Sequence, residues 1–532
     1  MAYHKSTSKS ATPAIPTSRK QHVIALLTHP LLMLVTITLV GLGLRCFQLG
    51  ANGYWHDEMI TTFLARLPPG EIVQSVTISD SHPPLYHILV HGWLLLIGDD
   101  LLSLRFFSVL LSTLCILLTY VLGRQLFGVS GSGIALLAAA LMAISPFQIF
   151  HGQQARMYPL LAVLVLVTTI LFWQAWQRQR WFWWLGFGVS VGAGLYTHVF
   201  YFLSLPALTF WALYDSVVQR QLDWRRWIPL LGLQIVAALA FLPFLPNMLN
   251  LTRAVVRSFW VQPSTGFDWV FMLVSVSNHA TIAHDPRLVT PFWYLIATFL
   301  PGVAALLLTL VYSLREARRK PAERSVWVLL HLLIWTPIGL ATIISLTIRS
   351  ILVDRGLIGL SAPLALMMAA LFLRFRAHGA VQVLTVAFVL SNFASLGFAY
   401  AQARESTMIE MADYLVQQQQ PGDAIAVSEW QSFDALVLAH PEATDAYLLP
   451  GLSDRQGLEA RARIMRWQTP DHIAPIEAFA PDYQRVWFAL TTYGDVPYHQ
   501  QFTRGWLDAY GELVHEERFG SAVVYLYELT PP

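Results

Sequence analysis

Long apolar runs separated by short polar segments make up most of the chain as far as about residue 400. A predominantly apolar stretch of about 18 to 24 residues is long enough to cross the hydrocarbon core of a bilayer as one α-helix. Runs of this length predict about eleven spans, at 23–44, 101–122, 131–149, 157–176, 181–199, 200–217, 227–245, 291–314, 325–347, 351–373 and 380–400. The sequence therefore predicts a mainly α protein built as a polytopic transmembrane helical bundle.

One further apolar run, 85–97, is only about 13 residues long, which is more typical of an interfacial or re-entrant segment than of a span. Whether it spans decides the orientation of every later loop. If it does not span, every basic cluster falls in a cytoplasmic loop, as the positive-inside rule requires. These clusters are Arg124; Arg178 and Arg180; Arg220, Arg225 and Arg226; the basic residues of 315–324; and Arg374 and Arg376. We therefore predict a cytoplasmic N-terminus and one large first outer loop, 45–100, with juxtamembrane helices.

The composition changes after the last predicted span, because the following segment has no spanning run and alternates helix-like and strand-like pieces. Residues 405–419 have helical spacing, and 424–427, 485–490 and 522–527 are typical of short strands. About 130 residues are enough for one small α/β domain, and the topology places it outside the membrane. The predicted parts are a cytoplasmic tail at 1–22, a transmembrane domain at 23–400 and an extracytoplasmic α/β domain at 401–532.

The overall composition supports a membrane protein and argues against nucleic-acid binding. Hydrophobic residues make up 55% and charged residues 12% of the chain, and that charged share is about half the roughly 25% of globular domains. The formal net charge is +2, with the basic residues scattered between apolar runs, so no nucleic-acid partner is expected. Cys46 and Cys115 lie in different apolar runs and form neither a metal-ligand spacing nor a disulfide framework.

The stretch 54–86 in the first outer loop is the most unusual part of the sequence. It opens with Tyr-Trp-His-Asp-Glu and closes with Ser-His-Pro-Pro-Leu-Tyr, and ionisable groups at membrane level mark functional sites by default. Asp57 or Glu58 could accept the proton of an attacking hydroxyl, a general-base effect typically worth about 10²–10⁴ in rate. Both could also cap the helix that follows, since acidic residues suit a helix N-terminus. One arrangement can serve both roles.

Other polar residues of the outer segments are candidates for substrate binding. His82 precedes a rigid proline pair, and it could bind substrate, hold a metal with Asp57 and Glu58, or lie solvated at a turn. Arg156 and Arg355 lie at the outer ends of their spans, where an arginine can snorkel to lipid headgroups or neutralise a phosphate. The remaining candidates are His56, Tyr86, Tyr158 and His198.

Several familiar catalytic motifs do not occur in the sequence. It contains no glycine-rich phosphate loop, no zinc-protease helix and no nucleophile elbow. The cytoplasmic side shows no evident nucleotide-binding domain. If the chain is a transferase, we expect its activated donor to arrive through the membrane.

Three motifs together resemble the integral-membrane glycosyltransferases of the C-type fold, specifically the bacterial relatives of protein O-mannosyltransferases and aminoarabinose transferases. They are the Asp57-Glu58 pair, the Ser-His-Pro-Pro-Leu-Tyr-His sequence at 81–87, and the Gln-Ala-Arg-Met-Tyr-Pro-Leu sequence that ends at Leu160. Arg355 resembles that family's arginine before a late helix, although Gly356 stands where an aromatic residue is common. The resemblance in architecture covers most of 23–400, and many relatives also carry an extracytoplasmic C-terminal domain.

The resemblance implies an inverting transfer of a sugar from a polyprenyl-phosphate-linked donor to a glycan, lipid or protein acceptor on the outer, periplasmic face. It implies that Asp57 deprotonates the acceptor hydroxyl, and that Glu58 and His82 orient substrates or hold a divalent metal. It also implies that Arg156 and Arg355 contact the lipid phosphate. Apart from that candidate metal, no cofactor is expected.

Two other classes of protein compete with this hypothesis. A transporter or flippase of a lipid-linked or polar substrate also places polar groups in an apolar bundle, but transporters usually show internal repeats and broken helices, and the sequence indicates neither. A membrane scaffold that presents 401–532 to partners has no use for the polar residues of 54–86. Because the polar residues collect at one face, the sequence favours an enzyme.

Overall fold

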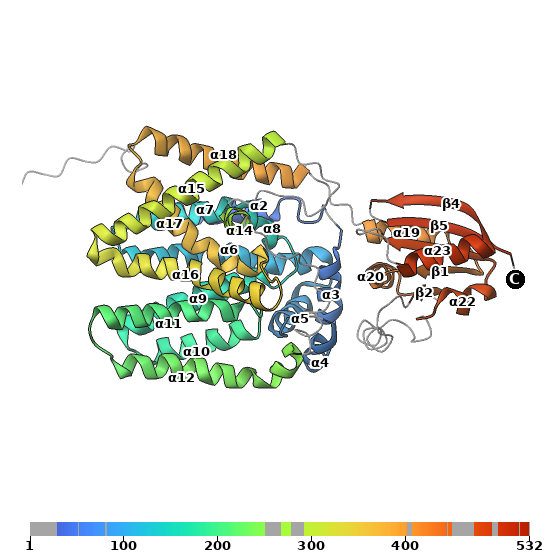
Figure 1. Cartoon of the computed structure of the whole chain (residues 1–532), viewed down its shortest axis with the longest axis horizontal. Helices are drawn as coiled ribbons and strands as arrows, with labels where there is room; N and C mark the ends of the chain where they lie inside the picture. Colours follow the sequence, from blue (N-terminus) through green and yellow to red (C-terminus); the bar gives the residue numbers. More distant parts are fainter. Residues whose placement is uncertain are drawn as a thin grey trace, which may run out of the picture.

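A bundle of long helices and a smaller α/β domain at one end of it form the molecule, as Figure 1 shows. This computed structural model describes residues 29–51, 53–79, 82–249, 268–277, 292–401, 407–443, 445–449, 473–491, 498–520 and 522–530. The predicted tail 1–22 and most of the segment between the predicted spans 227–245 and 291–314 lie outside the described residues.

Apolar helices occupy the positions of the predicted spans. In chain order they are α2 (Pro30–Cys46), α6 (Leu101–Phe127), α7 (Ser132–Ile144), α8 (Pro146–Gly152), α9 (Tyr158–Arg178), α10 (Trp181–Leu195), α11 (Tyr201–Val218), α12 (Trp224–Phe241) with η1 (Leu242–Phe244), α15 (Phe292–Arg319), α16 (Pro321–Thr347), η2 (Asp354–Leu360), α17 (Ser361–Arg374) and α18 (Gly379–Ala401). One further helix, α14 (Asp268–Ser277), lies between the predicted spans 227–245 and 291–314.

Helix length separates these elements into two groups. Among the described residues, eight helices are long and apolar enough to cross a membrane, or nine if α7 and α8 form one bent span. The other two predicted spans correspond to α2 and α10, which are shorter apolar helices. The run 85–97 forms α5 (Leu85–Ile97), a helix of 13 residues, as expected for a segment that does not span. The chain is a multi-pass integral membrane protein.

The predicted span 131–149 is broken in its middle, which the sequence analysis did not anticipate. α7 and α8 meet at an angle of 56°, because Pro146 lacks the backbone N–H that would continue α7. Arg45 compensates for the break by donating hydrogen bonds to the carbonyl oxygens of Met142 and Ala143, both at 3.1 Å. A cation at the C-terminal end of a helix meets both its unpaired carbonyl groups and its negative dipole end.

The predicted first outer loop folds into three short helices at the end of the bundle that faces the C-terminal domain (Figure 1). They are α3 (His56–Ala65), α4 (Pro69–Ser79) and α5. The stretch 54–86 therefore comprises α3, α4 and the start of α5. It forms a small helical layer between the bundle and the α/β domain.

The C-terminal domain is built on a mixed sheet, and within the described residues this sheet has five strands in the order β2-β1-β3-β5-β4. β1 pairs in parallel with β2 and β3, whereas β5 pairs antiparallel with β3 and β4. The strands are β1 (Asp423–Val427), β2 (Ala446–Leu448), β3 (Arg485–Thr491), β4 (Gly511–Phe519) and β5 (Ala522–Leu529). The helices are α19 (Thr407–Gln418), α20 (Trp430–Ala439), α22 (Ile476–Phe479), η4 (Ala480–Asp482) and α23 (Tyr498–Tyr510).

These elements confirm the expected α/β character of the C-terminal domain and its three predicted strands.

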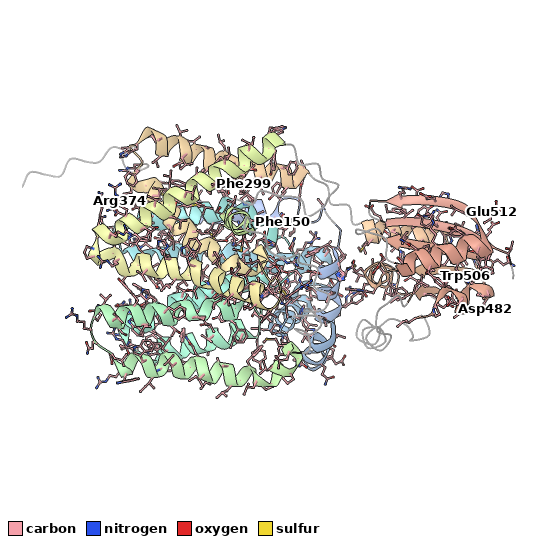
Figure 2. All side chains as sticks on the ribbon, viewed as in Figure 1. Phe150, Phe299, Arg374, Asp482, Trp506 and Glu512 are labelled. Atoms are coloured by element: carbon pink, nitrogen blue, oxygen red, sulfur yellow. The ribbon has the colours of Figure 1, made fainter. Side chains whose placement is uncertain are left out.

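The two ends of the bundle make different contacts. α20 of the C-terminal domain packs against α3, whereas Arg374 lies at the opposite end of the bundle, as Figure 2 shows. Arg374 forms a salt bridge with Glu316 there, at 3.2 Å.

Candidate active site

Glu58 is fully buried, and Arg105 holds both of its carboxylate oxygens. The Arg105 guanidinium donates from Nε to Oε1 at 2.9 Å and from Nη2 to Oε2 at 2.6 Å. Such a bidentate pair fixes the carboxylate in direction as well as in position. Oε2 also accepts from the backbone N–H of Trp55 at 3.5 Å, so Glu58 caps the N-terminus of α3, as one of the two sequence interpretations expected.

The same pair ties together parts of the chain that are distant in sequence. Glu58 Oε1 accepts from the backbone N–H of Ala155 at 2.9 Å, inside the third motif. Arg105 also donates to the carbonyl oxygens of Leu49 and Gly53, at 2.8 Å each. The start of the outer loop, α6 and the motif before α9 are therefore joined at one ion pair.

Arg105 is a residue that sequence reasoning missed. It lies near the start of the predicted span 101–122, among apolar neighbours. An isolated arginine in a membrane helix has to find a partner, so it was a signal that could have been used. The sequence alone did not identify Glu58 as that partner.

Asp57 points to a different side of α3 from Glu58 and remains accessible, with 24% of its side chain exposed. Its Oδ1 lies 3.6 Å from Nδ1 of His56, and its Oδ2 lies 3.7 Å from Nε of Arg156. Both distances exceed those of ordinary hydrogen bonds. The carboxylate thus lies between one imidazole and one guanidinium, without the short bidentate hydrogen bonds that Glu58 receives.

Arg156 is buried and holds the backbone at Asp57. Its Nη1 donates to the carbonyl oxygen of Asp57 at 3.0 Å and to Oγ1 of Thr61 at 3.2 Å. The Thr61 hydroxyl itself donates to the same carbonyl at 3.1 Å. The third motif is thereby fastened to the first turn of α3.

Four other sequence-predicted side chains form a row that is joined to this turn through Tyr158, two residues after Arg156. His82 stacks on His198 with ring centroids 4.3 Å apart and an interplanar angle of 24°. His198 lies 5.8 Å from the ring of Tyr158, and the guanidinium of Arg355 lies over Tyr158 at 5.6 Å. Four segments of the chain therefore meet here.

Backbone and side-chain bonds hold this row in place. The backbone N–H of Leu85, after the proline pair, donates to the carbonyl of Tyr196 at 3.0 Å. Nδ1 of His198 accepts from the backbone N–H of Phe200 at 3.0 Å. His82 and Arg355 are half-buried, whereas Tyr158 and His198 are buried. The two half-buried side chains can meet a ligand, and the two buried ones back them.

Tyr86 is a buried residue that is linked to the site through Ser108. It is fully buried, and its hydroxyl and that of Ser108 share a hydrogen bond of 2.9 Å. Ser108 in turn donates to the carbonyl of Arg156 at 3.4 Å. Burial raises the pKa of the Tyr86 phenol, so the group stays neutral. Its contacts are structural ones, although the sequence suggested substrate binding.

The donor set for the suggested divalent metal was Asp57, Glu58 and His82. Within the described ranges, no three His, Cys, Asp or Glu side chains gather closely enough to hold a metal ion. Both oxygens of Glu58 are also engaged by Arg105. This set does not fit a metal centre.

A second network holds the segment before the third motif. The carbonyl oxygen of Gln148 in α8 accepts from Ser112 at 2.9 Å, and Arg45 donates to that same hydroxyl at 2.7 Å. The side chain of Gln153 donates to the carbonyls of Arg45 and Phe47, at 3.1 and 2.8 Å. Arg156 therefore follows directly from a firmly anchored turn.

A helical bundle of this kind, with a smaller α/β domain packed at the end that carries the polar residues, is the architecture of the C-type fold. Residues 81–247 match the model of a family described as dolichyl-phosphate-mannose-protein mannosyltransferase. That range includes His82, Arg156 and His198, and it does not include Asp57 or Arg355. A search of curated protein sequences gave no match.

Two solved structures resemble almost the whole chain. One is ArnT from Cupriavidus metallidurans in the apo state, with 13% sequence identity and a TM-score of 0.62, covering 92% of this chain and 97% of that one. The other is the same protein bound to undecaprenyl phosphate, with 12% identity, a TM-score of 0.58 and the same coverages. At such low identity the likeness shows the fold. The chain therefore has the C-type fold that its motifs predicted.

Proposed function

We propose that this protein is a glycosyltransferase that moves a sugar from a polyprenyl-phosphate-linked donor to an acceptor hydroxyl at the outer, periplasmic face of the membrane, with inversion at the anomeric carbon. The observation that carries the proposal is the position of Asp57. It is an accessible carboxylate, held between His56 and Arg156. The lipid part of the donor is supported by the family match and by the ArnT structure that holds undecaprenyl phosphate.

The two adjacent carboxylates support a single displacement. A double displacement would need one carboxylate as nucleophile and a second group as acid and base. Glu58 is unsuited to either role, because it is buried and both of its oxygens accept from Arg105. Asp57 alone is suited to taking the proton as the acceptor oxygen attacks the anomeric carbon. The bond from that carbon to the phosphate oxygen breaks, and the phosphate leaves with the electron pair.

Arg355 is the group that we assign to the departing phosphate. It is half-buried, and it lies over Tyr158 in the row that leads to His198 and His82. A fixed cation near the developing negative charge stabilises the transition state. Arg156 was the other candidate for this role, but its contacts with the Asp57 carbonyl and Thr61 favour the positioning of the base.

The charge distribution supports the outer face. Arg374 and its ion-pair partner Glu316 lie at the end of the bundle away from the C-terminal domain. Under the positive-inside rule, the basic loops are cytoplasmic and the C-terminal domain is outside. The N-terminus is then cytoplasmic. The site lies on the domain's side, where α3 packs against α20.

One observation favours the alternative of a transporter or flippase. The span formed by α7 and α8 is bent by 56° at a proline, and broken helices line the substrate sites of many transporters. In this chain, however, Arg45 caps the end of α7. The break leads into the segment that carries Arg156. We therefore infer that it shapes an active site.

The deciding experiment is radiolabelled sugar transfer from a panel of polyprenyl-phosphate sugars by the purified full chain, with the Asp57→Asn variant alongside. Loss of the general base is expected to lower the transfer rate by about 10²–10⁴. Asparagine keeps the size and the polar contacts of the side chain, so the melting temperature should stay close to that of the wild type.

Asp99→Asn is the matched control, because Asp99 lies in the same outer loop and forms an exposed pair with Arg66. It should transfer at the wild-type rate. Equal transfer by wild type and Asp57→Asn would overturn the assignment of the base. Translocation of a lipid-linked substrate without any sugar transfer would favour the transporter instead.

A further inference from the structure

The carboxyl ends of the parallel strands in the C-terminal domain form an edge that has no role in the site described so far. β1 has β2 on one side and β3 on the other, and all three strands are parallel. The chain passes from β1 to β2 on one side and then crosses to β3 on the other. In open α/β sheets, ligands bind outside the carboxyl ends of the strands at such a switch point.

Trp430 lies at this edge and contacts the membrane domain. It is the first residue of α20, which follows the carboxyl end of β1 after only two residues. Its indole meets the ring of His56 edge to face, with centroids 4.3 Å apart and an angle of 79°. α20 also packs against α3, and Figure 1 shows the two helices facing each other.

The contact brings the C-terminal domain to the base. His56 is adjacent to Asp57, and its Nδ1 lies 3.6 Å from the Asp57 carboxylate. Trp430, His56 and Asp57 are each half-buried, so their surfaces are not consumed by packing. At this contact the C-terminal domain supplies the switch-point edge of its sheet, and the membrane domain supplies the accessible carboxylate of Asp57.

The two sides of Asp57 offer different chemistry. On the side of Oδ2 lies Arg156, two residues before Tyr158, over which Arg355 lies, and these two cations suit an anionic phosphate. On the other side lie two aromatic rings, with the carboxylate of Glu429 next to Trp430 in the chain. A sugar ring presents an apolar face, which can pack on an indole. It also presents hydroxyl groups, which can donate hydrogen bonds to a carboxylate.

We propose that Trp430 and His56 form the wall of the acceptor site, and that the acceptor is a sugar hydroxyl. The C-terminal domain thus supplies a specificity-determining residue to an active site whose base comes from the membrane domain. This inference rests on the proposed function, because it needs a donor on the other side of Asp57. The acceptor would enter between α20 and α3.

The test compares Trp430→Ala, Trp430→Phe and wild type, as purified full chains, with a panel of octyl glycosides as acceptors. Transfer is followed together with slow hydrolysis of the donor when no acceptor is present. Loss of the indole should raise the acceptor KM by about 3- to 10-fold, and phenylalanine should restore most of the loss. The kcat value and donor hydrolysis should stay near the wild-type values, because neither depends on the wall.

Trp506→Ala is the matched control. Trp506 is also a half-buried tryptophan of the C-terminal domain, but it packs on Tyr510 in α23, and Figure 2 shows it away from the membrane domain. It should leave the acceptor KM unchanged. In a double-mutant cycle on the acceptor KM, His56→Ala should add little to the effect of Trp430→Ala, because both remove the same wall. Any change in kcat for His56→Ala reports instead on its contact with the Asp57 carboxylate.

The possible results separate the two proposals. If the wild type transfers sugar but Trp430→Ala keeps a normal acceptor KM, the wall is overturned and the proposed function stands. A parallel loss of transfer and donor hydrolysis also overturns it, since Trp430 would then act through the base. Transfer to serine or threonine peptides and to no glycoside overturns the acceptor class. If the wild type transfers from no donor, the proposed function fails, and the wall fails with it.

Discussion

Asp57 and Glu58 are consecutive residues of α3, yet they face two different regions of the molecule. On the inner side, Glu58 is fully buried and takes three hydrogen bonds from Arg105 and the backbone N–H of Ala155. On the outer side, Asp57 keeps 24% of its side chain exposed and meets cationic and aromatic groups at longer range. Because successive helical residues point about 100° apart, one turn can give one carboxylate to structure and leave the other for chemistry.

This difference also explains how the Asp57 carboxylate can be held in a fixed position while its side chain stays partly exposed. Its backbone is fixed by Arg156 and Thr61 at the carbonyl of Asp57. The next residue in the chain is fixed by Arg105. A reactive group is best held by neighbours whose own positions are locked. The buried contacts of Glu58 therefore help to fix the position of the neighbouring Asp57.

The largest effect that separates the two regions is expected for Glu58→Gln. The substitution removes the charge from one partner of a buried ion pair and leaves Arg105 buried without its counter-ion. Breaking such a pair typically costs about 3–5 kcal/mol of stability. Denaturant or thermal unfolding of the purified protein would measure it, and transfer should fall only in proportion to the folded fraction.

The control for this prediction is again Asp99→Asn, because Asp99 pairs with Arg66 at the surface. Exposed pairs contribute about 0–1 kcal/mol, so the stability of this variant should change little. A Glu58→Gln protein with normal stability and no transfer would reverse the comparison. Glu58 would then be the catalytic group.

A smaller effect, on rate and not on stability, is expected for Arg156→Lys. Lysine keeps the charge, but its single ammonium cannot replace both Nη1, which donates to the Asp57 carbonyl and Thr61, and Nε, which faces the Asp57 carboxylate at 3.7 Å. A shift of the base by about 1 Å can cost about 100-fold, so kcat should fall by about 10- to 100-fold. Steady-state kinetics with the best donor of the panel would measure it.

The same experiment sharpens the assignment of the phosphate contact. If Arg156→Lys raises the donor KM and leaves kcat unchanged, Arg156 binds the lipid phosphate, as the family resemblance implied. Arg355→Lys is the matched variant, because Arg355 lies over Tyr158 at the end of the row and is the residue assigned to the phosphate. Under our proposal, Arg355→Lys and not Arg156→Lys changes the donor KM.

Much of the architecture was predictable from the sequence, because hydrophobic length and loop charge are properties of whole segments. They located the helices of the bundle, the short α5 and the α/β domain. The break at Pro146 was not predicted, because residues 131–149 are apolar enough to be counted as one span. A proline inside a run also does not reveal that Arg45, far away in sequence, caps the broken end.

The site was predictable as a set of residues and not as a set of roles. The motifs named Asp57, Glu58, His82 and Arg156; three of these meet at the first turn of α3, and His82 stacks on His198. The sequence did not tell which carboxylate faces inward, because that depends on Arg105 in another helix. It also gave no sign of Trp430, since nothing local links α20 to His56.

The smallest effect, and the most direct comparison of the two regions, comes from the neighbouring threonines of α3. The Thr61 hydroxyl donates to the Asp57 carbonyl at 3.1 Å and accepts from Arg156 at 3.2 Å. The Thr62 hydroxyl donates to the Glu58 carbonyl at 2.9 Å. Both side chains are buried, so a change to valine preserves the shape of either site and removes its hydrogen bonds.

Thr61→Val should therefore lower kcat by about five-fold, the equivalent of one hydrogen bond of about 1 kcal/mol. Thr62→Val should leave kcat unchanged and lower the unfolding free energy by about 1 kcal/mol. Each variant is the control for the other, since they are adjacent, equally buried and chemically identical changes. Equal losses of kcat in both would mean that the first turn of α3 acts as one rigid unit. The position of the Asp57 carboxylate would then depend on the whole turn, and not on the hydrogen bond from Arg156 to the Asp57 carbonyl alone.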